Sequence, residues 1–289
     1  MPLQITPTVI PALCQLSSWS IKDEDEFIQA LAWLYLQKPT HAEKIARALI
    51  PLKKAGLPGN PFLGAMEKLT YRLDDLTADL ASADNKIQRK AKEQLDARVS
   101  HRDGLLFQHI SWLAAAIQFP NSLKAPPHSR AADKGFDGVI LDVNLSTKKI
   151  SRLIMCEDKA STDPRRHVRK AVWEEFKIIA AGIRDDEVNS SVTGLLSTLH
   201  GASEEDLEDI LDAVCWQKVR QFRVAVAVGP DRARKGVYAH LFRGFDKAHP
   251  KGTETTRYAE VMPMQDVRQT LDEIAKKVHA KLEEMKSNV

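Results

Sequence analysis

The stretch ISRLIMCEDKAS (residues 150–161) begins as an apolar run and ends in three consecutive charges. The apolar residues before Glu157, with no glycine or proline among them, predict a buried β-strand. Successive side chains on a strand point to opposite faces, so we expect Glu157 and Lys159 on one face and Asp158 on the other. The end of this strand is therefore the first place to look for a functional site.

A second strand is predicted just before it, in FDGVILDVN (136–144), and the turn-like LSTKK connects the two. Neighbouring strands joined in this way bring Asp137, Glu157 and Lys159 together at one end of a sheet. Carboxylate oxygens suit a hard ion such as Mg²⁺, which keeps several waters and shares its shell with phosphate oxygens. A lysine beside them can position an attacking water or counter the charge that develops on a phosphate. The three residues form a minimal site for phosphodiester hydrolysis.

Composition and length place the chain among ordinary globular proteins. Its 289 residues are 28% charged and 43% hydrophobic, which argues against wholesale disorder and against a membrane protein. The N-terminal residues lack the basic start and apolar block of a secretion signal, so we expect a cytoplasmic protein. Cys14, Cys156 and Cys215 have no paired spacing, which argues against a zinc module and fits a reducing compartment.

Charge is unevenly distributed along the second half of the chain. Residues 148–184 contain ten Lys and Arg against five Asp and Glu, and residues 218–257 contain ten against three. Between them, residues 185–212 contain nine acidic residues and no Lys or Arg. Two basic stretches of this density can line a surface for a polyanion such as nucleic acid. Solvated helix faces and loops are the equally weighted alternative.

The pattern of elements predicts an α/β fold, with a mixed sheet flanked by helices and preceded by a helical N-terminal region. Residues 1–99 read as helical, with a seam at Met66, Leu69, Leu73, Leu76 and Leu80. That seam indicates a core stripe, with a helix that docks a partner as the alternative. Residues 100–289 read as a helix followed by strands and helices, and the strands include QFRVAVAVG and GVYAHLF. A boundary between two domains is expected near residue 99.

The segment FDGVILDVNLSTKKISRLIMCEDK resembles the core signature of the PD-(D/E)xK nuclease superfamily. The resemblance implies that Asp137 and Glu157 are metal ligands, that Lys159 is the catalytic lysine, and that Asp158 is a further ligand through its backbone carbonyl. It covers residues 100–289 and implies a restriction-endonuclease-like fold with Mg²⁺ or Mn²⁺ as cofactor. The tripeptide occurs four times in the chain, but only Glu157 follows an apolar strand.

Two features depart from the family pattern. Phe136 stands where the family name has proline, a common variation. Many members add an acidic residue from the preceding helix, whereas the candidates here are Gln108 and His109. Either side chain can orient a metal-bound water. For each residue taken alone, the plainer interpretation is a packed helix residue. Asp142 competes with Asp137, but it lies an odd number of residues along the strand and is expected to face away.

Two groups of basic residues are candidates for contacts with nucleic acid. The first group crowds the start of the helix after the motif, where positive side chains oppose the helix dipole; it comprises Arg165, Arg166, Arg169 and Lys170. Pairing with the acidic stretch 185–212 is the alternative for this group. The second group lies on an expected hairpin tip, where ordinary surface is the alternative; it comprises Arg232, Arg234 and Lys235.

The resemblance implies an enzyme, a metal-dependent endonuclease that hydrolyses DNA, with defence against foreign DNA as the expected role. The alternative is a nuclease-fold module that has lost catalysis and binds nucleic acid or a protein partner. DNA is the expected partner, and a homodimer is a further possibility because two strand breaks in one duplex are simplest for a dimer. The chain has no Walker-type phosphate loop, so any translocation or unwinding requires a separate helicase or ATPase.

Overall fold

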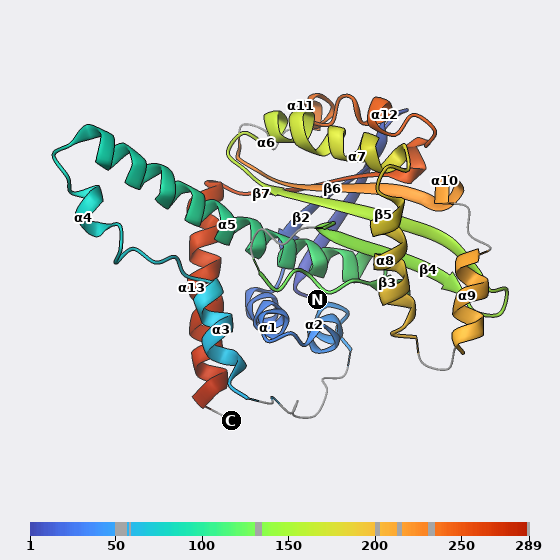
Figure 1. The fold of residues 1–289 in the computed structure, drawn as a ribbon, viewed down its shortest axis with the longest axis horizontal. Coiled ribbons are helices and arrows are strands. Elements are labelled where there is room, and N and C mark those ends of the chain that lie inside the picture. The colour runs from blue at the N-terminus through green and yellow to red at the C-terminus, as the bar shows by residue number, and fades with distance from the viewer. Residues whose placement is uncertain are drawn as a thin grey trace.

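The computed structural model describes residues 1–49, 57, 59–130, 135–199, 203–212, 216–230 and 235–287. These form a mixed α/β structure around one seven-stranded sheet with the order β1-β2-β7-β6-β5-β4-β3 (Figure 1). The strands are β1 (Leu3–Ile10), β2 (Cys14–Ile21), β3 (Leu123–Lys124), β4 (Gly138–Asn144), β5 (Lys149–Ala160), β6 (Arg220–Val228) and β7 (Arg257–Pro263). The four central strands β2, β7, β6 and β5 are parallel, and the pairs at both edges are antiparallel. The predicted α/β class and mixed sheet are confirmed.

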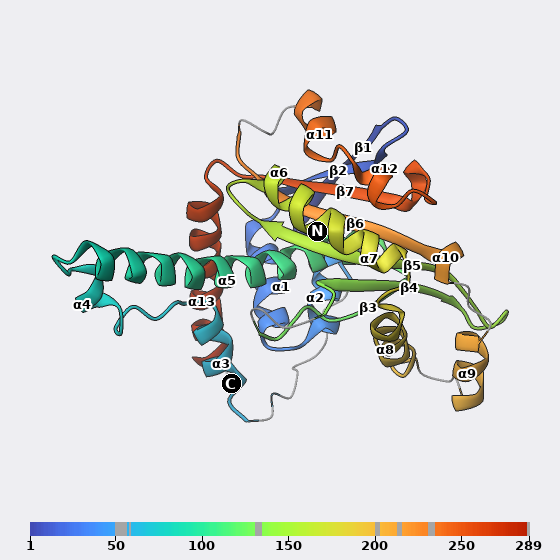
Figure 2. The ribbon, with the colours of Figure 1, turned by 45° about the horizontal axis from the view of Figure 1, so that its top comes forward.

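Helices cover both faces of the sheet (Figure 2). One core cluster lies between the sheet and α1, α2, α3, α5 and α13, and a second lies between the sheet and η1, α7, α8, α11 and α12. Strand β6 packs against both and reads as a nearly continuous apolar run, as expected of a central parallel strand. The helices are α1 (Glu24–Tyr35), α2 (Pro39–Ala46), α3 (Pro61–Lys68), α4 (Thr77–Leu80), α5 (Asn85–Gln118), α6 (Pro164–His167), the π-helix η1 (Val168–Val172), α7 (Trp173–Ala180), α8 (Asp185–Leu196), α9 (Glu204–Asp212), α10 (Trp216–Val219), α11 (Lys235–Leu241), α12 (Phe245–Ala248), the 3₁₀-helix η3 (Glu254–Thr256) and α13 (Val267–Ser287).

The prediction of a helical region over residues 1–99 is wrong at its start. Residues 3–21 form the hairpin β1–β2, whose second strand joins the sheet beside β7. Trp19 alternates with polar serines and packs into the core shared with α1 and α13, so this hairpin is held by the sheet and its core rather than by local helix propensity. The expected boundary near residue 99 falls inside α5, a single helix of 34 residues.

Two other sequence expectations are also wrong. The leucine seam does not lie on one helix, because α3 ends at Lys68 and α4 is a separate turn; Leu69 and Leu76 are buried, whereas Leu73 is exposed. GVYAHLF lies in α11 rather than in a strand, and the partner of β6 is β7, which sequence reasoning missed. A parallel pair needs a long crossover instead of a tight turn, so β6 and its partner β7 are not joined as a hairpin.

No helix in the described part of the chain is long and apolar enough to cross a membrane.

Candidate active site

The three residues singled out from the sequence meet where β4 begins and β5 ends. The antiparallel register pairs Gly138 with Cys156, which brings Asp137 beside the last residues of β5. The Lys159 ammonium donates to Glu157 Oε2 at 2.8 Å and to Asp137 Oδ2 at 3.2 Å. The side chains of Asp137 and Glu157 are only 14% and 11% exposed, so both carboxylates sit in a largely desolvated site.

Asp137 is held in place by donors from two elements. The backbone N–H of Asp158 donates to its Oδ2 at 2.8 Å, and Gln108 Nε2 on α5 donates to its Oδ1 at 2.5 Å. With Lys159 included, Asp137 accepts three hydrogen bonds, which fixes the rotamer of a carboxylate that has little contact with water. Gln108 is therefore part of the site, although the sequence offered it only as one of two candidates.

Burial and neighbouring charges perturb the ionisation of the site. Burial raises the pKa of Glu157 to about 7; the Lys159 ammonium opposes this shift, and the Asp137 carboxylate adds to it. Burial alone lowers the pKa of Lys159, but the carboxylates of Glu157 and Asp137 outweigh it and hold that pKa above its ordinary value. Lys159 is therefore a fixed positive charge at neutral pH, placed between two carboxylates.

A second cation, Arg184, lies near the site and was missed by sequence reasoning. Its guanidinium stacks over the Phe136 ring at 4.5 Å, and its pKa is raised by Glu187 and, through space, by the Glu157 carboxylate. It also pairs with Glu175 of α7. No motif marks Arg184 in the sequence, because it stands in the short connection between α7 and α8 and reaches the site only through the fold.

The chemistry of the oxygen donors fits a hard divalent cation. Gln108 Oε1 is buried and has no hydrogen-bond partner among the described residues, which a bound cation or water would supply. Carboxylate and amide oxygens are the donors that Mg²⁺ prefers, with waters and substrate phosphates completing the shell, and Asp137, Glu157 and Gln108 offer such oxygens here. No group of three or more His, Cys, Asp and Glu residues gathers into a metal site within the described ranges. An ion here would therefore rest on two carboxylates and one amide.

The Asp158 side chain lies on the opposite face of the sheet, as the strand period predicts. Ser111 of α5 donates to its Oδ1 at 2.7 Å, and Arg223 of β6 lies 3.8 Å away. Arg223 also donates to Ser111 Oγ and to Glu260 Oε2 of β7. Burial raises the pKa of Asp158 to about 7, against the opposing charge of Arg223. Its side chain thus belongs to a buried ionic network beneath the site, and its role as a metal ligand through the carbonyl stays a prediction.

The structure does not bring His109 or Asp142 to the carboxylates. The His109 ring stacks on Tyr35 at a centroid distance of 4.3 Å, its Nδ1 lies 2.8 Å from Leu105 O, and burial lowers its pKa to about 4. It is a packed helix residue on the α1 side. Asp142 pairs with Arg152 at 2.6 Å, between the neighbouring strands β4 and β5. It does not replace Asp137 in any contact at the site.

The first basic group divides into one structural residue and three exposed ones. Arg165 donates to the carbonyl oxygens of Leu241 and Arg243, each at 2.9 Å, and so ties α6 to the segment after α11. The other three are exposed on α6 and η1 and form no ion pair within the described part of the chain: Arg166, Arg169 and Lys170. The acidic stretch 185–212 pairs instead with three other cations, Lys148, Arg184 and Arg220. The alternative, that the first basic group pairs with this acidic stretch, is therefore wrong.

The second basic group is only partly described. Arg232 and Arg234 lie outside the described residues, and Lys235 is the first residue of α11. The segment expected to form the second strand of that hairpin lies in the helix α11 instead.

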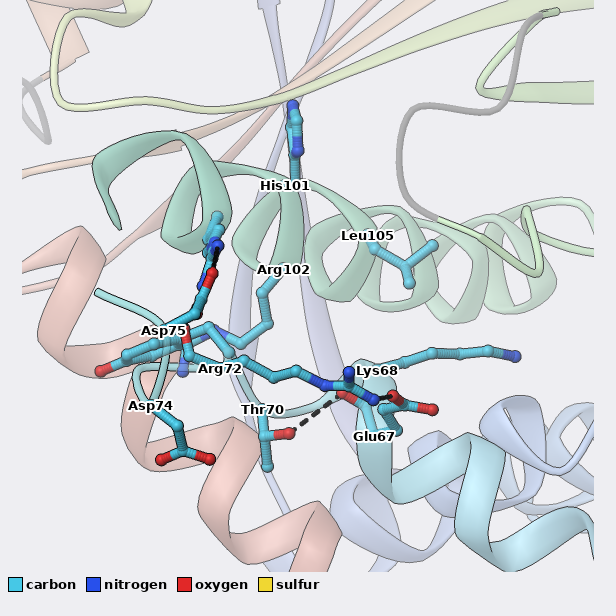
Figure 3. Close-up of a pocket in the computed structure, with 11 residues that line it drawn as sticks. Glu67, Lys68, Thr70, Arg72, Asp74, Asp75, His101, Arg102 and Leu105 are labelled. Carbon is cyan, nitrogen blue, oxygen red and sulfur yellow. Dashed lines mark hydrogen bonds and ion pairs between the residues drawn. The ribbon is translucent and has the colours of Figure 1, made fainter. Parts of the chain in front are cut away.

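A cleft of about 690 Å³ lies away from Asp137, Glu157 and Lys159, between α5 and the segment that joins α3 to α4 (Figure 3). Its charged side chains largely satisfy one another, since Arg98 binds Asp75 through two hydrogen bonds and Arg72 pairs with Glu67. Arg102 stacks over Tyr71 and pairs with Asp272. A cleft whose ions are already paired has little charge left for a ligand, so volume does not select it as the site.

Comparisons of the chain with protein-family models, with curated proteins and with solved structures found no match. The site is therefore interpreted from its own geometry and from the motif in the sequence.

Proposed function

We propose that this chain is a metal-dependent nuclease that hydrolyses phosphodiester bonds in DNA, on a restriction-endonuclease-like arrangement of β4, β5 and α5. The observation that supports it most is the placement of Lys159 between two buried carboxylates at the ends of adjacent strands, with contacts of 2.8 and 3.2 Å. The orphaned Gln108 oxygen beside Asp137 is the second. The resemblance of the motif extends the proposal to defence against foreign DNA.

Each residue has a chemical role in this proposal. Asp137, Glu157 and Gln108 would hold a Mg²⁺ or Mn²⁺ ion. Bound there, the ion supplies a water of lowered pKa and neutralises charge on the scissile phosphate. Lys159, held protonated by its carboxylate neighbours, donates to a phosphate oxygen or to the attacking water and balances the negative charge of the transition state.

DNA would approach across the side of the sheet that carries α6 and η1. Arg166, Arg169 and Lys170 are exposed there without ion-pair partners in the described ranges, and α6 follows directly from the strand that carries Lys159. Unpaired exposed cations contact phosphates without reading bases, so binding is expected to weaken steeply with salt.

A nuclease-fold module without catalysis is the second candidate. It is favoured by the small number of acidic ligands, since among the described residues two carboxylates meet at the site and Lys159 binds both of them. In that case the same exposed cations would bind nucleic acid or an acidic partner while the site remains silent.

Cleavage of plasmid and of single-stranded DNA by the purified chain, with Mg²⁺ or with EDTA, tests the proposal. We expect cutting with Mg²⁺ that is lost in Lys159→Ala and in Asp137→Ala. Lys149→Ala is the matched control, because Lys149 is exposed at the other end of the same strand. Metal-dependent cutting that persists in both site variants would refute the assignment. Salt-sensitive DNA binding without cutting would establish the second candidate.

A further inference from the structure

A separate pocket of about 280 Å³ lies where the end of α7 meets α12 and the segment that follows it. In the sheet, Arg220 at the start of β6 pairs with Leu153, six residues before Lys159, so the pocket lies roughly 20 Å along the sheet from the candidate active site. Four cationic side chains, one histidine and four apolar residues line it: Lys177, Arg220, Lys247, Lys251, His249, Ala180, Ala181, Ala248 and Pro250.

Within the described part of the chain, the lining carries cations and no carboxylate. Two of the cations have partners outside it, since Arg220 pairs with Asp185 and Lys177 with Glu174. Lys247 is exposed at the rim and forms no ion pair with any described residue. The pocket therefore has an excess of positive charge.

Two buried polar atoms at this pocket lack partners. Arg220 is 3% exposed and donates through its two terminal nitrogens to Ile179 O and Asp185, but its Nε has no acceptor among the residues that the structure describes. His249 is 5% exposed, and its Nδ1 has no partner among these residues either. Buried polar groups in folded proteins almost always find a partner, and Arg220 Nε can only donate, so it indicates a missing acceptor. His249 Nδ1 can donate to the same acceptor in the tautomer that carries its proton on Nδ1.

We propose that this pocket binds a phosphate group, either free or carried by a nucleotide. The oxygens of a phosphate can accept from Arg220 Nε and from the neutral His249 imidazole at the base, while the ammonium group of Lys247 balances its charge at the rim. Alanine and proline side chains form the rest of the wall and suit the less polar body of a nucleotide. The volume lies just below the usual range of small-molecule pockets, about 300–1,000 Å³, and selects a small ligand.

A neighbouring groove indicates how a longer ligand would continue. It shares Lys177 and Lys247 with the pocket and extends along α7 to Arg169 and Arg243, with Glu174 and Asp246 also in its lining. A terminal phosphate of an oligonucleotide could thus occupy the pocket while the following phosphates lie in the groove. Free phosphate, a mononucleotide and a nucleic-acid end share the same chemistry at the base of the pocket.

Calorimetric titration of the full chain, in low salt and EDTA, distinguishes these sources. The ligands are inorganic phosphate, dAMP, and one oligonucleotide with and without a 5′-phosphate. We expect Lys247→Gln to weaken binding roughly tenfold or more, as loss of a charge-assisted contact does. Lys149→Gln, an exposed change of equal charge, should leave it unchanged. Arg220→Lys, which keeps the charge but removes Nε, should weaken it as well.

Lys159→Ala separates this site from the candidate active site, because it removes the proposed catalysis and should leave phosphate binding intact. Binding by inorganic phosphate and dAMP that Lys247→Gln weakens supports a free ligand. Binding only by the 5′-phosphorylated oligonucleotide, again weakened by Lys247→Gln, supports a nucleic-acid end. The absence of any binding at millimolar ligand, or binding lost in Lys159→Ala but kept in Lys247→Gln, overturns the proposal.

Discussion

Replacing Arg223 by methionine should destabilise the fold more than any exposed ion-pair variant of this chain. Arg223 is 1% exposed and donates to Ser111 Oγ at 2.7 Å and to Glu260 Oε2 at 2.5 Å, with Asp158 at 3.8 Å. The Arg223→Met variant leaves the carboxylate of Glu260, itself 1% exposed, without its cation. Removing one partner of a buried ion pair costs about 3–5 kcal/mol, a large part of a typical unfolding free energy of about 5–15 kcal/mol.

Urea unfolding at pH 7 measures this effect, and Arg98→Met provides the matched control. Arg98 makes two hydrogen bonds to Asp75, at 2.7 and 2.6 Å, but it is 32% exposed and its partner 62%, so solvent screens the pair and its loss should cost far less than the loss of Arg223. Adding Glu260→Leu to Arg223→Met should restore at least about 1 kcal/mol, because the stranded charge is then gone. The reasoning is refuted if Arg223→Met destabilises no more than Arg98→Met, or if the second change deepens the loss.

Three further outcomes are expected. Gln108→Leu should stay folded, yet lower Mg²⁺ affinity, measured calorimetrically, by about 10–100-fold, since it removes both a donor to Asp137 and the orphaned oxygen; unchanged affinity would exclude Gln108 from the ion site. The pKa of His109 is about 4 in the fold and about 6.5 unfolded, so the unfolded chain binds more protons between these values and stability falls as pH falls through them. His109→Phe should remove roughly 2 kcal/mol of the loss seen in urea unfolding between pH 7 and pH 5; an identical pH slope in both proteins would contradict this. Gly252→Ala should lower stability by about 1–3 kcal/mol in thermal unfolding, because a Cβ there meets the His249 ring, whereas Gly194→Ala on α8, with open space around it, should raise stability by up to about 1 kcal/mol.

The juxtaposition of Asp137, Glu157 and Lys159 could be predicted because it depends on local rules. The two-residue period places Glu157 and Lys159 on one face, and a short connection makes β4 and β5 neighbours. Nothing else in the chain needs to be known. Arg184 could not be predicted in this way, since its approach to Glu157 depends on where the connection between α7 and α8 passes over the sheet.

The errors in the fold arise where short apolar runs are ambiguous. GVYAHLF has the β-branched and aromatic residues of a strand, yet all of it but Phe242 lies in α11. Tyr238 and Leu241 of that helix and Phe242 directly after it are buried at three- and four-residue spacing. Periodicity over seven residues does not separate these cases. The hairpin of residues 3–21 was missed for a different reason, because its second strand completes a sheet whose nearest member, β7, lies more than two hundred residues along the chain.

The charges at the end of β5 serve two purposes, one on each face of the strand. Glu157 and Lys159 meet Asp137 on one face, while Asp158 between them binds Ser111 on the other. On α5, Gln108 and Ser111 are three residues apart and therefore adjacent on one side of the helix. Gln108 binds Asp137 just before the start of β4, and Ser111 binds Asp158 near the end of β5. One turn of α5 thus fixes the start of β4 and the end of β5 relative to each other. The three charges that end β5 are explained by this geometry, because Glu157 and Lys159 belong to the site and Asp158 binds α5.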